Sequence, residues 1–399
     1  MSDAGSATGI REREIEAMTR PLDGEVGHRL DEVFDRALAE QRIVGAVVLV
    51  AEGGRSAYAR AGGMADRAAG RPEAFDTIFR LASLTKPMVT AAALALIEDG
   101  VLGFEDPVTR WLPDFKPALG GAAATITIRQ LLTHTAGLSY GFMQPDDGPY
   151  LRLGVSDGMD RPGLGFEAQL GRIVEAGLTY PPGGAWLYSV SMDVLGAVLE
   201  QAAGKSLAQV MADRVAAPLG MRDTGFAVTD PARLAVAYAD ATPPVEMGET
   251  CTVPFAELSG IRFAPGRAFD AGSFPSGGAG MVGTAGEFLA FLEAIRTGGG
   301  GIVGNGMAAE MMRNQTGDLP IVTNGPGFGF GFGGAVLLDP AAAGSGHSPG
   351  VWLWGGVYGH SWFVDPARQL SVLVMTNTAI EGMTGAFATE VAGAVQAGG

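Results

Sequence analysis

The spacing of hydrophobic residues along the first hundred positions predicts a helix, a hairpin and a second helix. Apolar residues recur at helical intervals over 23–41, which predicts a helix with one buried face. The apolar run 44–50 predicts a buried strand, and 56–62 predicts its hairpin partner across a Gly-Gly turn. From 84 to 100 the chain is rich in alanine and apolar on almost every side, so we expect a buried helix that ends at a glycine.

The rest of the chain divides into a region of short helices and a region of strands. Residues 102–257 contain short helical patterns between loops rich in proline and glycine, and the clearest helices are 128–133 and 192–203. The last third contains three strand-like runs separated by turn residues, followed by a terminal helix. These four segments are 329–338, 352–364, 370–376 and 385–396.

These elements predict an α+β fold in which one antiparallel sheet is flanked by helices. Strands lie near both ends of the chain, and consecutive strands are joined by turns instead of crossover helices. We therefore expect the first and last strands to share one sheet, with a mostly helical domain, 102–257, inserted between them. The sheet domain is then discontinuous, 23–101 and 258–399, and residues 1–22 form an N-terminal extension.

Composition and charge narrow the classes of function. The chain has 399 residues, of which 47% are hydrophobic and 18% charged, as in folded globular proteins. The net charge of −16 argues against nucleic acid or an anionic membrane surface as a partner. Cys251 is the one cysteine, and the four histidines lack the spacing of metal ligands. We therefore expect no disulfide within the chain, no metal and no cofactor.

The apolar stretches are too short to predict export or membrane insertion. The longest of them, around 88–97, falls far below the ~20 residues that a membrane-spanning helix needs. The start of the chain is polar and then charged, without the apolar core of a signal peptide. We expect a cytoplasmic protein, and the sequence predicts no particular oligomeric state.

A serine and a lysine at the start of the buried helix form the first chemical motif. Ser83 and Lys86 are three residues apart, so on a helix their side chains lie on one face. Unpaired N–H groups of a first turn favour an alkoxide or oxyanion, and a nearby ammonium helps a base to activate a serine nucleophile. The simpler interpretation is a capping serine with a solvated lysine. Ser-x-x-Lys alone is therefore suggestive rather than decisive.

A tyrosine after a Pro-Gly turn is the second candidate. Tyr188 follows the turn at 182–184 and precedes the helix predicted at 192–203. A phenolate can act as a general base if nearby ammonium groups lower its pKa from the usual value of about 10. The alternative is a buried tyrosine whose hydroxyl is simply hydrogen-bonded.

A glycine pair on a late strand is the third candidate. Gly355 and Gly356 follow Trp354, and glycines inside a strand often mark the close approach of another group. On this interpretation the N–H of Val357 points into the site beside that of Ser83, and two such donors form an oxyanion hole. The alternative is a bulge or a bend in the strand.

Taken in order, these motifs resemble those of a known group of serine hydrolases. Ser83-x-x-Lys86 within 79–86, Leu-Leu-Thr-His-Thr at 131–135, Tyr188, and the segment 354–365 are similar to the enzymes built on the class C β-lactamase and DD-peptidase fold. Within that group the chain looks most like the family VIII carboxylesterases, some of which deacetylate cephalosporins. The similarity runs from about residue 30 to the last helix.

The resemblance implies a β-lactamase-like fold and a role for each motif residue. Ser83 would be the nucleophile, Lys86 its electrostatic partner and proton relay, and Tyr188 the general base. The N–H groups of Ser83 and Val357 would hold the oxyanion. The substrate pocket would lie between the two domains and include residues of the late strand, namely Trp354, Gly355, Gly356 and Tyr358. The loop 140–150 would be either a mobile aromatic lip or a plain surface loop.

Two departures from the lactamase pattern favour esters over β-lactams. The tyrosine motif there is Tyr-x-Asn, whereas Val190 stands at the third position here. The late-strand motif there begins with a lysine, whereas Trp354 stands here, so recognition of anionic substrates should weaken. We expect a serine carboxylesterase for small neutral or aromatic esters, including, as one candidate, the acetyl ester of cephalosporins. An amidase or β-lactam hydrolase with the same site is the alternative, as is a non-catalytic binding module on the same fold.

Other serines and histidines are weaker candidates. Ser156 and Ser348 each lie in a Gly-x-Ser-x-Gly pentapeptide, but neither follows a strand and opens a helix, as that motif requires. His134 and His360 have no orienting carboxylate nearby in the sequence, and we expect them to be structural. The glycine-rich segment 276–280 lacks the Gly-Lys-Ser/Thr of a phosphate loop and predicts a turn.

Overall fold

The computed structural model describes residues 24–255 and 259–396, and within them eight strands form one sheet. The predicted extension 1–22 and the predicted domain boundary at 257/258 lie outside the described residues. All neighbouring strands are antiparallel, in the order β12-β13-β14-β15-β16-β1-β2-β3. The strands are β1 (Gly45–Glu52), β2 (Arg55–Asp66), β3 (Arg71–Pro72), β12 (Phe328–Phe330), β13 (Ala335–Leu337), β14 (Trp352–Gly356), β15 (His360–Asp365) and β16 (Leu370–Thr376).

Strands from opposite parts of the chain meet in the middle of the sheet. β1 pairs with β16 over seven residue pairs and with β2 on its other side. Val47 and Leu49 face one hydrophobic cluster, whereas Val48 and Val50 face a second cluster on the opposite side. Because both faces are covered, the strand is apolar from Ala46 to Ala51 instead of alternating. The predicted α+β sheet that joins the two ends is confirmed.

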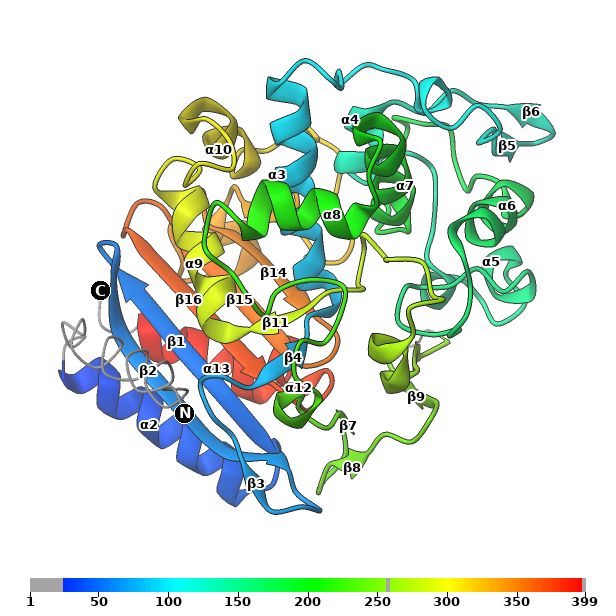
Figure 1. Cartoon of the computed structure of the whole chain (residues 1–399). Coiled ribbons are helices and arrows are strands. Elements are labelled where there is room, and N and C mark those ends of the chain that lie inside the picture. Colours follow the sequence, from blue (N-terminus) through cyan, green and yellow to red (C-terminus); the bar gives the residue numbers. More distant parts are fainter. Residues whose placement is uncertain (1–23, 256–258, 397–399) are drawn as a thin grey trace, which may run out of the picture.

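Two helices cover the outer face of the sheet (Figure 1). They are α2 (Gly24–Ala39) and α13 (Ala386–Gln396), and α13 follows the short helix α12 (Glu381–Thr384). The rings of Phe34 and Phe387 meet edge to face between α2 and α13, with their centroids 5.9 Å apart. The apolar positions of both helices therefore pack against the strands, as their periodicity predicts.

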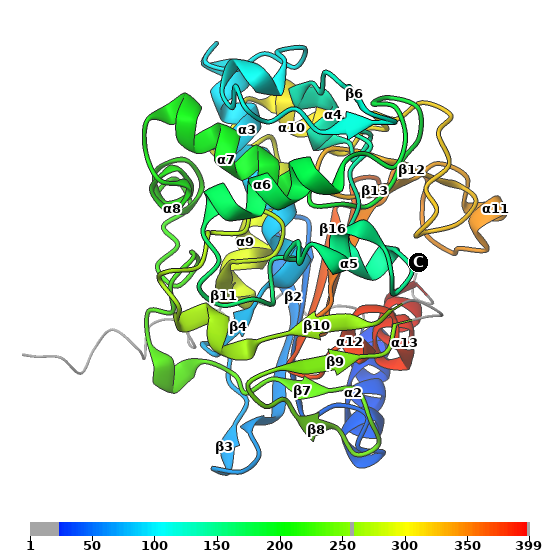
Figure 2. The ribbon, with the colours of Figure 1, turned by 90° about the vertical axis from the view of Figure 1, so that its right-hand side faces the viewer.

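The opposite, inner face carries α3 (Thr85–Glu98) and α9 (Ala285–Arg296), as Figure 2 shows with the sheet seen edge-on. Every residue of α3 from Thr85 to Leu96 is buried. A helix that is apolar all round must be covered on all sides, which is the situation here. α3 thus forms the centre of the molecule and carries Lys86 into it.

The region predicted as mostly helical packs against α3 through α7 (Figure 2). It is less purely helical than expected, because three pairs of short strands lie in it and just after it. The helices are α4 (Ile128–Leu132), α5 (Pro149–Arg152), α6 (Phe166–Ala176), α7 (Ser191–Ala203) and α8 (Leu207–Met211). The strands are β5 (Ala118–Leu119), β6 (Ala122–Ala123), β7 (Tyr238–Ala239), β8 (Val245–Glu246), β9 (Cys251–Val253) and β10 (Ile261–Phe263). The division into domains remains a prediction.

Two of the predicted strand-like runs are hairpins in the structure. The run 329–338 contains β12 and β13, and the run 352–364 contains β14 and β15. The turn between β14 and β15 ends at Gly359, whose φ of 111° strongly favours glycine. The glycine pair after Trp354 therefore ends a strand next to a turn.

Candidate active site

Ser83 lies in one turn of 3-10 helix, η1 (Ala82–Leu84), that leads directly into α3. The chain enters this turn from β4 (Ile78–Arg80), which pairs with β11 (Val282–Thr284). Ala82, immediately before the serine, has a φ of 46°, in the left-handed region that residues with a side chain seldom adopt. Backbone strain of this kind is often found at functional sites, where the surrounding structure holds it in place.

The three predicted catalytic side chains meet at the Ser83 hydroxyl. The Tyr188 hydroxyl donates to Ser83 Oγ over 2.6 Å, and Lys86 Nζ donates to the same oxygen over 3.1 Å. Lys86 Nζ also donates to the carbonyl oxygen of Gly278 over 2.7 Å, and Trp354 Nε1 donates to the Tyr188 hydroxyl over 3.2 Å. Residues from four separate parts of the chain thus form one hydrogen-bonded cluster around a potential nucleophile.

Burial determines the protonation of this cluster. Lys86 is only 1% exposed, and its burial lowers its pKa to about 7, an effect partly opposed by the charges of Asp193 and Asp157. Burial also raises the pKa of Tyr188 well above its usual value. We expected neighbouring ammonium groups to lower the pKa of this tyrosine, but desolvation dominates and shifts it in the opposite direction. At neutral pH the group poised to lose or accept a proton is Lys86.

The sequence did not identify the residues that hold Lys86 in place. Segment 276–280, predicted as a plain turn, brings the Gly278 carbonyl to Lys86 Nζ. Asp193 Oδ1 accepts hydrogen bonds from Gly278 N, over 3.1 Å, and from the Ser276 hydroxyl. Burial raises the pKa of Asp193, while the nearby Lys86 ammonium opposes that shift. The only hint in the sequence is the position of Asp193 in the first turn of a helix, where a carboxylate is favoured.

The predicted oxyanion-hole residues line the same cavity. Ser83 and Val357 both contribute to its wall, and Val357 lies in the turn directly after β14. A Cβ on Gly356 would lie 2.7 Å from the Leu81 carbonyl oxygen and 3.0 Å from Leu84 Cδ1. The absence of a side chain at Gly356 therefore allows the segment before Val357 to approach the serine turn closely.

The cavity has a volume of about 680 Å³ and an aromatic wall. Trp354 and Gly355 line it, as predicted, together with Phe142 and Met143 from the predicted lip 140–150 and Phe255. Beneath them Tyr140 is buried, stacking on Phe142 and tilting against Tyr188. Within the segment 140–150, Phe142 and Met143 thus belong to the cavity wall, and whether the segment moves as a lip stays a prediction.

Two predicted pocket residues have other surroundings. Tyr358 does not contact the cavity: its ring packs on Phe263, with the centroids 4.8 Å apart, and lies beneath the Arg80 guanidinium. Burial raises the pKa of Tyr358 to about 12, so it is a neutral phenol. Gly356 also stays outside the wall, because it is pressed against the serine turn. Both residues support the turn that carries Val357.

The two histidines are buried in structural positions. His134 Nδ1 lies 3.2 Å from Ser189 Oγ, and its ring centroid is 5.0 Å from that of Tyr188. Burial holds the pKa of His134 well below its usual value, so the ring is neutral. His360 Nε2 lies 2.8 Å from the Arg80 carbonyl oxygen, and burial lowers its pKa to about 4. Neither ring contacts Ser83, although His134 supports the ring of Tyr188.

The other serine motifs do not reach the cavity. Ser156 is fully buried, and its hydroxyl donates to Asp160 Oδ1 over 2.6 Å. Ser348 lies in the loop before β14, outside the cavity wall. Among the described residues no group of three or more His, Cys, Asp or Glu side chains is arranged to hold a metal ion. The absence of a metal and a cofactor remains a prediction.

Comparison with known proteins identifies the family. Residues 30–396 match the sequence model of the Beta-lactamase family. Esterase EstB from Burkholderia gladioli is 51% identical over 373 residues, which cover 92% of this chain and 95% of that protein. The solved structure of EstCE1, a hydrolase with promiscuous acyltransferase activity, is similar with a TM-score of 0.89 and 47% identity, covering 94% and 99% of the two chains. Lovastatin esterase from Penicillium rubens is 27% identical over 381 residues, covering 86% and 90%.

These similarities extend over nearly the whole length of both partners, so they apply to the complete fold and not to a fragment of it. They confirm the resemblance to the carboxylesterases with a β-lactamase-like fold, and the alternative of a non-catalytic binding module is not supported. The chain belongs to the Beta-lactamase family and is a serine carboxylesterase within it.

Proposed function

We propose that this carboxylesterase hydrolyses small neutral or aromatic esters through an acyl-enzyme formed on Ser83. The observation that carries the proposal is the convergence of Lys86 Nζ and the Tyr188 hydroxyl on Ser83 Oγ at the wall of an aromatic cavity. A serine with two titratable partners within hydrogen-bond reach fits the geometry of an activated nucleophile. The relatives named esterase and the hydrolase EstCE1 support the same reaction class.

In the acylation step, the neutral amine of Lys86 accepts the proton of Ser83 as Oγ attacks the ester carbonyl carbon. With a pKa of about 7, Lys86 has enough of the neutral form at neutral pH to act as a base. The carbonyl oxygen becomes an oxyanion, which the N–H groups of Ser83 and Val357 stabilise. This assigns the base to Lys86, whereas the sequence alone favoured Tyr188.

As the tetrahedral intermediate collapses, the bond to the alcohol oxygen breaks and that oxygen takes a proton. Tyr188 is a neutral phenol within 2.6 Å of Ser83 Oγ, so its hydroxyl can donate that proton. The Lys86 ammonium then restores the tyrosine proton. In the second half, water attacks the acyl carbon, Lys86 again accepts the proton, and Ser83 regains its hydroxyl as the carboxylic acid leaves.

The cavity wall supports a preference for uncharged substrates. Trp354 occupies the place of the lactamase lysine, and its indole contacts Tyr188 instead of offering a cation. Val190 stands where the lactamases have an asparagine, so this position offers no side-chain amide to the substrate. Phe142 and Phe255 offer apolar surface to an aromatic acyl or alcohol group. The acetyl ester of a cephalosporin is one candidate substrate of this kind.

A small-molecule ester is the proposed partner. In the described ranges no helix has the length and apolarity that crossing a membrane requires. A cytoplasmic location and the exclusion of nucleic acid remain predictions from the sequence.

Labelling with a fluorophosphonate, followed by mapping of the modified peptide, tests the proposal directly. We expect the label on Ser83, and we expect its loss in Lys86→Ala and a slower reaction in Tyr188→Phe. Ser156→Ala is the control and should label normally. A label that persists in Ser83→Ala would contradict the assignment. Comparing the hydrolysis of phenyl acetate with that of acetanilide separates the esterase from the amidase alternative.

A further inference from the structure

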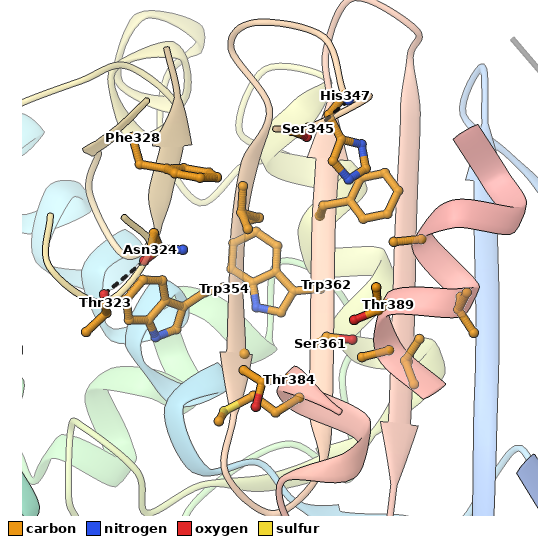
Figure 3. A pocket seen from close by; sticks show the side chains of 18 of the residues that line it. Thr323, Asn324, Phe328, Ser345, His347, Trp354, Ser361, Trp362, Thr384 and Thr389 are labelled. Atoms are coloured by element: carbon orange, nitrogen blue, oxygen red, sulfur yellow. Dashed lines mark hydrogen bonds between the residues drawn. The ribbon is translucent and has the colours of Figure 1, made fainter. Parts of the chain in front are cut away.

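The cavity continues well beyond the catalytic side chains. Its wall includes Ser83 and Tyr188, and also residues of β14, β15 and the outer helix α13. Figure 3 shows this part of the cavity, with Trp354 and Phe328 on one side and Thr389 and His347 on the other. We call the part lined by β14, β15, α13 and the loop before β14 the distal arm. Its wall includes Leu353, Phe363, Thr389, Ala392, Gly393 and Gln396.

The distal arm is long compared with a small ester. Its wall follows α13 from Ala388 to Gln396, a stretch of helix that spans roughly 12 Å at the usual rise per residue. The whole cavity, about 680 Å³, falls within the range of roughly 300–1,000 Å³ in which proteins enclose drug-sized ligands. An acetyl group on Ser83 would leave most of this space unfilled.

The chemistry of the wall changes along the arm. Leu353 and Phe363 project from β14 and β15 to give an apolar middle section. At the far end the wall includes Ser345, His347 and Gln396. The His347 ring lies against Phe363, with the centroids 4.5 Å apart, and burial lowers its pKa. The far end thus offers uncharged donors and acceptors at neutral pH.

We propose that the distal arm binds the far part of the ester substrate, an extended apolar chain or ring system that ends in an uncharged hydrogen-bonding group. The arm and Ser83 belong to one cavity, so a substrate whose carbonyl carbon lies at Ser83 Oγ is the occupant that the geometry favours. The inference rests on the proposed function and specifies its substrate class. The occupant is either the acyl chain or the alcohol part of the ester. Either part can be an extended apolar group with an uncharged hydrogen-bonding end.

Gly393 offers a way to fill the arm without disturbing the fold. It is an exposed residue of α13 that lines the cavity, and a Cβ placed on it would meet no atom within 4 Å. Gly171 in α6 is also exposed, has the same open surroundings, and lies outside the cavity wall. Gly171→Leu is therefore the matched control, because both changes replace a helical glycine with leucine.

The experiment compares kcat/KM for two series of esters in the wild type, Gly393→Leu and Gly171→Leu. One series lengthens the acyl chain, from p-nitrophenyl acetate to p-nitrophenyl decanoate. The other lengthens the alcohol, from ethyl acetate to decyl acetate. We expect Gly393→Leu to lower the long-to-short ratio about tenfold in one series, which identifies the occupant, and Gly171→Leu to leave the ratio as in the wild type.

An unchanged ratio in both series would overturn the inference while leaving the esterase assignment intact. A wild-type protein that hydrolyses neither acetate would instead contradict the proposed function. If Gly393→Leu does not fold, Thr389→Phe fills the same arm from an exposed position one helical turn away and carries the same expectation. His347→Phe keeps the ring against Phe363, and it should remove any preference for a decanoyl ester with a terminal hydroxyl over its methyl-terminated counterpart.

Discussion

If Lys86 is the base, the pH dependence of kcat/KM should follow its titration. Its pKa of about 7 lies far below the ordinary 10.5 because burial disfavours the ammonium. Since the neutral amine is the active form, activity should rise with pH through about 7. The neutral fraction is ~10% at pH 6 and ~90% at pH 8, so kcat/KM should increase about tenfold between these values.

Asp193→Asn provides the perturbation that tests this cause. The carboxylate of Asp193 raises the pKa of Lys86, and an amide oxygen can still accept the hydrogen bonds from Gly278 N and Ser276. Removing the charge should move the rising limb to lower pH, so the variant should keep more of its maximal activity at pH 6. The assay is kcat/KM for p-nitrophenyl acetate at constant ionic strength.

Asp157 is the necessary control, because burial and neighbouring charge raise its pKa to about 7 as well. If Lys86 causes the limb, Asp157→Asn must still show it. A wild-type profile that is flat from pH 6 to 8 would refute the reasoning, as would a limb that moves to higher pH in Asp193→Asn. A limb near 10 or above would assign the base to Tyr188 instead.

Three further predictions concern the stability of the protein and the serine turn. Lys86→Met should abolish activity and stabilise the protein by about 1–2 kcal/mol, because it removes a buried amine from an active site. In the wild type the pKa of Lys86 is lower in the folded than in the unfolded state, about 7 against 10.5, so the buried ammonium destabilises the protein fully below pH 7 and no longer above pH 10.5. The free energy of unfolding in urea should therefore be larger at pH 10 than at pH 7 in the wild type, and this increase should be lost in Lys86→Met. Gly356→Ala should lower kcat of the folded enzyme by roughly 10-fold or more, since its Cβ would press on the Leu81 carbonyl and shift the serine turn; an unchanged kcat would show that the turn tolerates the methyl group. Phe34→Ala should cost about 3–5 kcal/mol in urea unfolding without changing kcat of the folded fraction, because Phe34 packs against Phe387 on the outer face of the sheet.

The elements and the serine motif could be predicted from the sequence because each depends on local patterns. The all-round apolar run before Gly100 specifies a buried helix, and Ser83-x-x-Lys86 at its start places two functional groups on one face. The apolar run 44–50 likewise indicates a strand covered on both faces. The esterase assignment followed from the order of these motifs and the departure at Trp354, and it is confirmed.

The remainder depends on contacts between residues far apart in the sequence. Gly278 reaches Lys86 across 192 positions, and no local pattern indicates that contact. The direction in which the pKa of Tyr188 shifts follows from its burial, which only the packed structure reveals. Tyr358 stands next to Val357 in the chain, yet the turn between β14 and β15 directs its ring toward Phe263 and away from the cavity.

The pairing of β1 with β16 also has a consequence for how this enzyme is made. Ser83 leaves the ribosome long before β16, the strand that completes the middle of the sheet and ends at Thr376. Contacts of such sequence separation form late and slowly, since a long loop must close before they stabilise anything. A nascent chain arrested before β14 lacks Val357, Trp354 and the strand that closes the sheet. We therefore expect esterase activity to appear only after β16 has been synthesised, and folding before that point to be exposed to misassembly.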